Sequence, residues 1–312
     1  MLYFIVNEKS RSGKGADIWQ EVEHTLKAQN VAYKAWITEY EGHAISLARS
    51  ICEMEDDDIC LVALGGDGTA NEVINGMTNF DKVRFGIIPT GSGNDLARGL
   101  ALKGSPVENL ERILNCMDRG KDAGFLMDLG EVSFHGGEKP RLFAISAGIG
   151  LDALVCKRAL TSKVKKFLNK IHMGKLTYLV LTVQSLFTMR TFDVAAHFDG
   201  KGQKNLKKTI YIAAMNFKAE GGGVPMAPAA DAVDGLLSVC SLCGMPKWKS
   251  FICLPFLVIG KHLWIKAFEV NDCRECKLRI SEPVVLHADG EYCGDVTEVT
   301  FRCLPKKLRV LK

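Results

Sequence analysis

The chain has 312 residues, 47% hydrophobic and 24% charged, which is ordinary globular usage with enough apolar material for two domains. Its 40 Lys and Arg residues against 36 Asp and Glu residues give a net charge of +4, too even for the basic surface of a nucleic-acid-binding protein, so no nucleic-acid partner is expected. Eleven scattered cysteines and no basic, cleavable leader predict reduced thiols and a cytoplasmic location, and the most apolar stretch, Phe251 to Gly260, is too short to cross a bilayer.

The first part of the chain alternates short apolar runs with helical patterns. The expected strands and helices alternate as 2–6, 16–29, 31–38, 43–51, 59–64, 70–77, 85–88 and 94–100. This order is typical of βαβ units that build a parallel sheet with helices on both faces. We therefore predict an α/β domain over residues 1–125.

After Lys121 the pattern changes to strands that follow one another more closely. Strands are expected at 128–134, 141–147, 192–198, 208–216, 235–243, 277–281, 284–288 and 298–304, with helices near 151–170, 175–189 and 247–260. Runs of strands interrupted by few helices indicate a mainly antiparallel second domain, over residues 126–312. Its last strand could return to the first domain.

The strongest local signal is the segment Leu64-Gly65-Gly66-Asp67-Gly68-Thr69, which ends the third apolar run. Glycines at the carboxyl end of a parallel strand let backbone N–H groups approach phosphate oxygens closely. Thr69 and Glu72 have the spacing of a capping box, which predicts a helix start beside the loop. The alternative is a simple strand-to-helix turn with a capping Asp.

Two further loops follow neighbouring strands. Ser92 and Asp95, in the segment Pro89 to Arg98 (PTGSGNDLAR), repeat the capping spacing between glycines. The segment Asn7 to Gly15 follows the first strand, but it lacks the spacing of a Walker A loop and would by itself indicate a surface turn. Two such loops on adjacent strands could hold one nucleotide.

A third signal, Asp289-Gly290-Glu291, follows the strand expected at 284–288. From its residues alone, Asp-Gly at this place is first of all a hairpin turn.

Taken together, GGDGTANE at 65–72, PTGSGNDLAR at 89–98 and Asp289-Gly290-Glu291 closely resemble the diacylglycerol kinase catalytic-domain family, which includes sphingosine kinases. The resemblance covers nearly the whole chain and is similar to the soluble bacterial branch. It implies a nucleotide-binding domain like those of phosphofructokinases and NAD kinases, a β-sandwich domain after it, and ATP bound between them.

The resemblance implies a role for individual residues. The nucleotide contacts that it predicts are Asn7, Ser10, Arg11, Thr38, Gly65, Gly66, Asp67, Gly68, Thr69, Asn71, Glu72, Ser92 and Asn94. Phosphoryl transfer needs a positioned carboxylate and Mg²⁺ to neutralise the phosphates, so Asp289, Glu291 and Asp67 are the catalytic candidates. The sequence leaves open which of them is the base.

A glycine-rich segment from Gly221 to Leu236 resembles a family loop that holds a structural Mg²⁺. The resemblance implies Asp231 and Asp234 as side-chain ligands and Leu236 as a ligand through its carbonyl, which are the hard oxygen donors this ion prefers. A glycine-rich turn before a strand is the alternative. A separate Mg²⁺ is expected with ATP.

Two groups of residues bear on partners. Cys240-x-x-Cys243 and Cys273-x-x-Cys276 lack the turn of a zinc knuckle and indicate reduced thiols. Basic residues gather on expected helices at Lys157, Arg158, Lys163, Lys165, Lys166, Lys170 and Lys175, which indicates a solvated face or a site for anionic headgroups. Trp248, Lys249, Phe251, Trp264 and Lys266 could add an interfacial wall, so peripheral membrane association is expected.

The sequence therefore predicts an ATP- and Mg²⁺-dependent kinase that phosphorylates a lipid hydroxyl, with diacylglycerol as the first choice of acceptor. A sphingoid base, another glycerolipid or a polyprenol are open alternatives. NAD kinase is the nearest enzyme of another substrate class, and a non-catalytic nucleotide or lipid sensor is the alternative outside enzymes. The oligomeric state is open, with a homodimer as one possibility.

Overall fold

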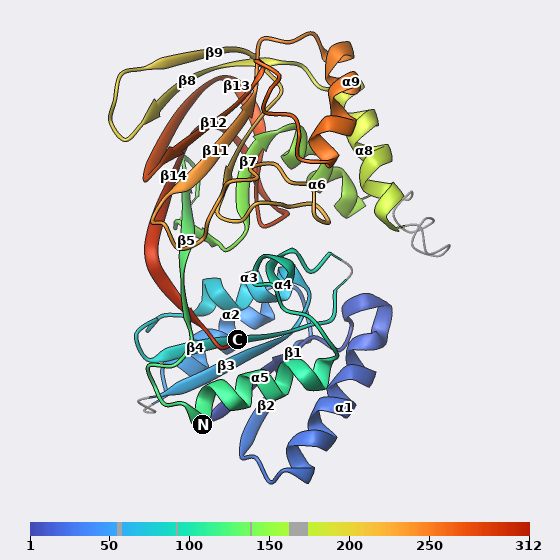
Figure 1. Cartoon of the computed structure of the whole chain (residues 1–312), viewed down its shortest axis with the longest axis vertical. Coiled ribbons are helices and arrows are strands. Elements are labelled where there is room, and N and C mark those ends of the chain that lie inside the picture. Colours follow the sequence, from blue (N-terminus) through green and yellow to red (C-terminus); the bar gives the residue numbers. More distant parts are fainter. Residues whose placement is uncertain (55–57, 92, 138, 162–173) are drawn as a thin grey trace. The chain divides into compact units, whose positions relative to one another are not determined.

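The computed structural model describes residues 1–54, 58–91, 93–137, 139–161 and 174–312 (Figure 1). The chain divides into two compact units. Unit 1 contains Met1–Asp128 and Lys306–Lys312, and unit 2 contains Leu129–Pro305. The last residues of the chain thus return to unit 1, as the sequence allowed.

Unit 1 is a parallel sheet with helices on both faces (Figure 1). Strands β1, β3 and β4 are buried along nearly their whole length, which is the pattern of strands covered on both sides. The sheet order is β2-β1-β3-β4, and Arg309 and Val310 add to β4. The elements are β1 (Leu2–Val6), a 3-10 turn η1 (Ser10–Gly13), α1 (Lys14–Ala28), β2 (Tyr33–Ile37), α2 (His43–Cys52), β3 (Ile59–Gly65), α3 (Asp67–Gly76), β4 (Val83–Pro89), α4 (Asp95–Gly99) and α5 (Pro106–Asp118).

One hydrophobic core of unit 1 lies between the sheet and helices α1 and α5. Phe4 of β1 and Val62 of β3 pack with Trp19 of α1 and Ile113 of α5. Helix α5 was missing from the sequence prediction, although Ser105 and Glu108 form a complete capping box at its start. That box, with Pro at the first helical position, was a signal that could have found it.

Unit 2 is built from antiparallel strand pairs. Its elements are β5 (Phe125–Phe134, which enters from unit 1), β6 (Arg141–Phe143), β7 (Ser146–Gly150), α6 (Leu151–Thr161), α8 (Gly174–Thr188), β8 (Phe192–Phe198), β9 (Lys204–Thr209), β10 (Tyr211–Met215), β11 (Leu237–Leu242), α9 (Lys247–Val258), β12 (Phe268–Cys273), β13 (Glu275–Ala288) and β14 (Glu291–Val310).

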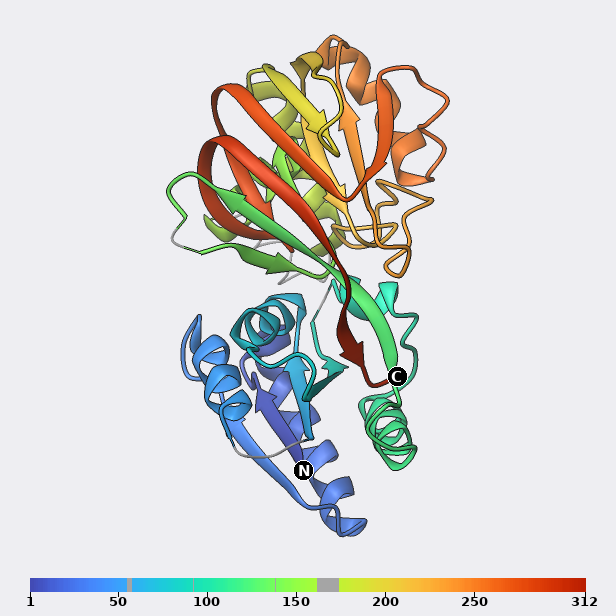
Figure 2. The ribbon, with the colours of Figure 1, turned by 90° about the vertical axis from the view of Figure 1, so that its left-hand side faces the viewer.

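Strand β13 joins two layers of this unit. Its first half pairs with β8 and its second half with β7, and the register shifts between Arg279 and Val284. Figure 2 shows β13 and β14 as long, bent strands at the red end of the colour range. The sequence divided β13 into two strands because the irregular stretch contains Pro283, and it missed β12, whose alternation is broken by polar residues. The predicted combination of an α/β domain and a mainly antiparallel β-sandwich is confirmed.

Candidate functional site

The predicted nucleotide loops of unit 1 lie at one edge of its sheet. They follow the carboxyl ends of β1, β2, β3 and β4, which are all parallel. In the order β2-β1-β3-β4 the chain reverses direction across the sheet between β1 and β3. Ligands of open α/β sheets bind outside the carboxyl ends of the strands at such a switch point.

Side chains tie these loops together across the switch point. Asn7, after β1, donates from Nδ2 to the Oγ1 of Thr69, after β3, at 3.0 Å. The hydroxyls of Ser10 and Thr90 lie 2.6 Å apart. Thr38 is almost fully buried, and its N–H donates to the carbonyl of Val6 at 2.8 Å. The structure therefore brings Asn7, Ser10, Thr38 and Thr69 to one edge of the sheet.

Where β3 meets α3, a side chain at position 65 would overlap Thr69, whereas one at position 66 would make an ordinary contact. A Cβ on Gly65 would lie 2.6 Å from the Oγ1 of Thr69, and one on Gly66 would touch Gly91 at 3.4 Å. Gly66 is the residue before α3, and no side chain caps the helix there. The start of α3 therefore directs the positive end of the helix dipole to this edge of the sheet, which favours the charge of a phosphate.

Asp67 links two of the loops through its carboxylate. Its Oδ2 accepts from the N–H of Asp95 and its Oδ1 from the N–H of Leu96, each at 3.1 Å. These two N–H groups lie in the first turn of α4, so the Asp67 carboxylate caps this helix. The sequence predicted a capping box of Ser92 and Asp95 for that role. The side chain of Asp95 instead pairs with Arg98. Ser92 lies outside the described residues.

The predicted capping box at Thr69 and Glu72 is wrong. Helix α3 begins at Asp67, so Thr69 and Glu72 are already inside it. Glu72 reaches α2, where its two carboxylate oxygens accept from the N–H groups of Gly42 at 2.9 Å and Ala44 at 3.2 Å. Because Gly42 has no side chain to cap α2, a carboxylate from the neighbouring helix fills that place.

The other predicted nucleotide contacts differ in position. Arg11 is exposed in a left-handed conformation with φ 49°. Asn71 is buried within α3 and accepts from Asn75. Asn94 precedes α4 with φ 51°, and its Oδ1 is buried without a hydrogen-bond partner among the described residues. That oxygen can accept a hydrogen bond from a ligand.

In unit 2, Asp289 is held by backbone N–H groups. Its Oδ2 accepts from Ala144 at 2.8 Å, and its Oδ1 accepts from Ile145 at 2.8 Å and from Ser146 at 3.1 Å. Asp289 itself lies in a turn with φ 48°, and Glu291 begins β14 directly after it. The three N–H groups fix the direction of the Asp289 carboxylate.

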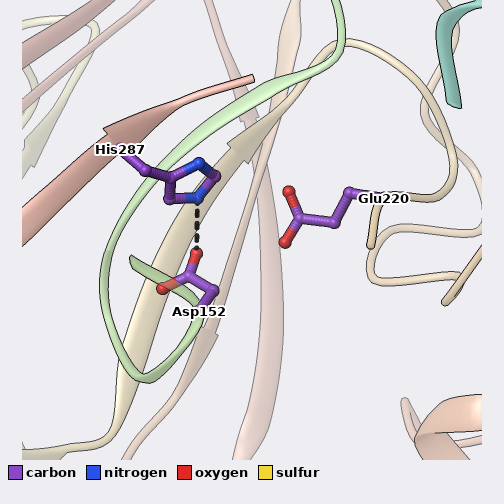
Figure 3. A group of neighbouring side chains, drawn as sticks. All are labelled: Asp152, Glu220 and His287. Carbon is purple, nitrogen blue, oxygen red and sulfur yellow. Dashed lines mark hydrogen bonds and ion pairs between the residues drawn. The ribbon is translucent and has the colours of Figure 1, made fainter. Parts of the chain in front are cut away.

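A cluster of polar side chains that the sequence did not predict lies beside this turn (Figure 3). Asp152 of α6, Glu220 of the segment after β10, and His287 of β13 place their ligand atoms within 4.8 Å of one another. His287 Nε2 lies 3.1 Å from Asp152 Oδ2, and the Ser146 hydroxyl donates to Glu220. His287 is separated from Asp289 by one residue, which was the available signal.

Gly148 of β7 and Tyr211 of β10 also lie at this cluster. A Cβ on Gly148 would overlap the Asp152 carboxylate and lie 3.1 Å from His287 Nε2, so only glycine leaves room for this pair. The hydroxyl of Tyr211 is buried without a partner among the described side chains. Burial raises its pKa well above the usual value, and Cys240, Asp152 and Glu220 add to the effect.

His287 has the proton arrangement of a hydrogen-bond donor to Asp152. In the neutral ring, Nδ1 accepts from the N–H of Gly290 at 3.2 Å and the proton lies on Nε2, facing Asp152. Protonation of Nδ1 gives up the hydrogen bond with Gly290. Burial opposes the charged ring, but the hydrogen bond to Asp152 and the charges of Asp152, Glu220 and Asp289 outweigh it and raise the pKa of His287 to about 9. The Nε2 proton therefore lies between the His287 ring and the Asp152 carboxylate.

The predicted Mg²⁺ loop forms a tight turn before β11. The N–H of Leu236 donates to Asp234 Oδ1 at 2.9 Å, and Asp231 and Asp234 are both exposed. Two carboxylates and a backbone carbonyl within one turn fit Mg²⁺ by donor type. Within the described part of the chain, no cysteine forms a disulfide.

Comparison with known proteins places the chain in a family. The model of the diacylglycerol kinase catalytic domain matches residues 1–125, and that of the YegS C-terminal NAD kinase beta sandwich-like domain matches residues 145–312. The chain belongs to the diacylglycerol kinase catalytic-domain family. It is therefore a kinase, and Gly65 to Thr69 lie in the part that the catalytic-domain model covers.

Similar proteins within the family are bacterial. The chain is 24% identical to YtlR of Bacillus subtilis (strain 168), whose name assigns it provisionally to the lipid kinases, over 99% of this chain and 98% of the relative. It is 28% identical to a diacylglycerol kinase of the same organism over 81% of this chain and 77% of the relative. The crystal structure of a diacylglycerol kinase from Bacillus anthracis str. Sterne shares the fold, with a TM-score of 0.67 at 17% identity, over 99% of this chain and 96% of that chain.

Proposed function

We propose that the chain transfers the γ-phosphoryl group of ATP to the hydroxyl of a membrane lipid, with diacylglycerol as the acceptor and phosphatidic acid as the product. The loop geometry at the switch point of unit 1 carries this proposal, together with membership of the family. Several relatives named diacylglycerol kinase support the choice of acceptor.

In this proposal, unit 1 holds the nucleotide. The backbone N–H groups of Gly66 to Thr69 face the phosphates at the start of α3, because glycine leaves the backbone open there. Mg²⁺ supplies charge neutralisation of the phosphates when it is bound, and the Asp67 carboxylate is the group in these loops that suits it. Asp67 also keeps the Pro89–Asn94 loop in place through the N–H groups of Asp95 and Leu96.

Unit 2 contributes the carboxylates Asp289 and Glu291 to phosphoryl transfer. The three N–H groups that bind Asp289 fix its orientation, so a hydroxyl can approach a carboxylate that does not have to reorganise. Asp231, Asp234 and the carbonyl of Leu236 would hold a second, structural Mg²⁺.

The test is turnover with radiolabelled ATP, a panel of lipid acceptors and NAD⁺. Diacylglycerol is expected to be the preferred acceptor. Asp67→Asn and Glu291→Gln should each lower kcat about 100-fold or more, because phosphoryl transfer depends on placed charges. Phosphorylation of NAD⁺ in place of any lipid would contradict the proposal, and so would near-normal rates in both variants. Nucleotide and vesicle binding without any product would favour a sensor.

A further inference from the structure

Helix α9 exposes an apolar face. Its inner face is buried through Ser250 and Cys253. Trp248, Ile252, Pro255 and Ile259 follow one another at intervals of four, three and four residues, so they form one stripe along the helix and its end. Trp248 is 63% exposed, and Ile252 and Ile259 are each 62% exposed. A helix that is apolar on all sides is normally buried by other elements, whereas this face of α9 is exposed.

The stripe extends to both neighbours of α9. Trp264, after the helix, is 70% exposed, and Phe187, at the end of α8, is 68% exposed. Rings of Phe187 and Phe251 lie 4.6 Å apart, and those of Phe256 and Trp264 5.5 Å apart. We call Phe187, Trp248, Ile252, Ile259 and Trp264 the apolar surface of α9. Figure 1 shows α8 and α9 beside one another in unit 2.

Contacts within unit 2 hold this surface in shape. Lys247 donates to the carbonyls of Phe187 at 3.0 Å and Met189 at 2.8 Å, which closes the end of α8. The buried ring of His262 lies 3.2 Å from the carbonyl of Met226, so the segment after α9 is anchored as well. The backbone that carries the exposed side chains is therefore held in place at both ends of α9.

The charged side chains of α9 and of the segment after it all have one sign. No Asp or Glu occurs between Gly244 and Phe268, whereas Lys247, Lys249, Lys261 and Lys266 do. The ammonium group of Lys249 lies 5.4 Å from the ring of Trp248. Trp and Lys together are typical of segments that sit at a membrane interface, because the ring and the lysine stem enter the apolar layer while the charge meets headgroups.

Of the basic residues expected near α6, the two whose side chains the structure describes have partners within unit 2. Lys157 is paired with Asp295 at 2.9 Å, and Arg158 donates to Ser185 and Thr188. Lys163, Lys165, Lys166 and Lys170 lie outside the described residues, as does the side chain of Lys175.

We propose that the apolar surface of α9 docks unit 2 on the face of an anionic phospholipid bilayer. The absence of acidic residues over this segment favours a negatively charged partner, and lysine is depleted at the cores of protein–protein interfaces. None of the described helices is long and apolar enough to cross a bilayer, so the helix lies in the interface. The statement that docking serves catalysis rests on the proposed function. The docking itself does not depend on that function.

The test is flotation of the full chain, without ATP or diacylglycerol, on vesicles of phosphatidylcholine with or without phosphatidylglycerol. We expect binding to the anionic vesicles. The double variant Trp248→Ser with Trp264→Ser should lower the partition coefficient about tenfold or more, because two exposed rings no longer enter the apolar layer. Lys249→Glu with Lys266→Glu should remove about tenfold of the anionic preference.

Tyr40→Ser is the matched control, because Tyr40 is also an exposed aromatic residue, 64% exposed, but belongs to unit 1. This substitution should leave vesicle binding unchanged. Brominated lipids should quench tryptophan fluorescence in the wild type and less in the tryptophan variant. Equal binding of wild type and tryptophan variant would overturn the inference. A second result would also overturn it: the wild type does not bind vesicles but forms a dimer, and the tryptophan variant is a monomer. That result would assign the surface to contact with a second copy of the chain.

The outcome can be separated from that of the proposed function. A short-chain diacylglycerol that dissolves as monomers should be phosphorylated equally by the wild type and the tryptophan variant, whereas diacylglycerol in anionic vesicles should be phosphorylated more slowly by the variant. No turnover of either substrate by the wild type would contradict the proposed function and leave the flotation result to decide docking.

Discussion

At the scale of single residues, several carboxylates that the sequence predicted to contact the nucleotide or to act in catalysis accept hydrogen bonds from backbone N–H groups. Asp67 caps α4, Glu72 caps α2 and Asp289 holds the start of β7. Each of these bonds joins residues far apart in the sequence. A carboxylate of this kind can act both as a ligand group and as a structural link, so a variant must be tested for stability as well as turnover.

Protonation of His287 should make stability depend on pH. Its pKa is raised from 6.5 to about 9 in the folded chain, so the folded state keeps a proton that the unfolded state loses. The stabilisation is complete below pH 6.5 and is lost as the pH rises through about 9. The free energy of unfolding should fall by up to about 3 kcal/mol over this window.

Urea unfolding at several pH values measures this dependence. His287→Gln should flatten the profile, whereas His24→Gln, at an exposed position of α1, should keep the wild-type slope. A wild type whose stability is constant between pH 6.5 and 9 would contradict a His287 pKa that is raised to about 9 by Asp152, Glu220 and Asp289.

At the scale of elements, α2 and α3 are joined by the side chain of Glu72. Glu72→Ala removes the acceptor for Gly42 and Ala44, and should lower the free energy of unfolding by about 1–2 kcal/mol. The affinity for ATP should change little. Thermal unfolding and equilibrium nucleotide binding measure the two effects.

Glu111→Ala, at an exposed position of α5, is the control for this helix contact. A Glu72 variant of full stability that has lost ATP affinity would support the nucleotide contact that the family resemblance implies, and would contradict a purely structural role.

Gly148 of β7 lies directly against the Asp152 carboxylate at the start of α6. In Gly148→Ala the new methyl group would meet Asp152 and His287, and the free energy of unfolding should fall by about 1–3 kcal/mol. Gly202→Ala is a matched control in the same unit, since a Cβ there meets nothing within 4 Å. Equal stability of the two variants would mean that Asp152 can move away without cost.

At the scale of the whole molecule, each unit has its own hydrophobic core. Chains with separate cores often unfold in more than one step. Calorimetry should therefore show two transitions. A Mg²⁺-bound ATP analogue at about 100 times its Kd should stabilise only the transition of unit 1, by about 2.7 kcal/mol.

Asp67→Asn should abolish this ligand-induced shift. A single transition that moves as a whole with the analogue would contradict independent unfolding, and would mean that β5 and β14, which belong to both units, couple them thermodynamically.

The sequence by itself determined the alternation of strands and helices over most of unit 1 and the position of the glycine-rich loops at the strand ends. These features are local: the apolar run of β3, Gly65 and Gly66 are consecutive, and their spacing is enough to predict a loop at a strand end. Only the tertiary structure decided where each carboxylate points, that Asp152 and Glu220 meet His287, and that one face of α9 is left uncovered. Those outcomes depend on packing between distant segments, and a hydrogen bond or a buried face is fixed only once its partner is in place.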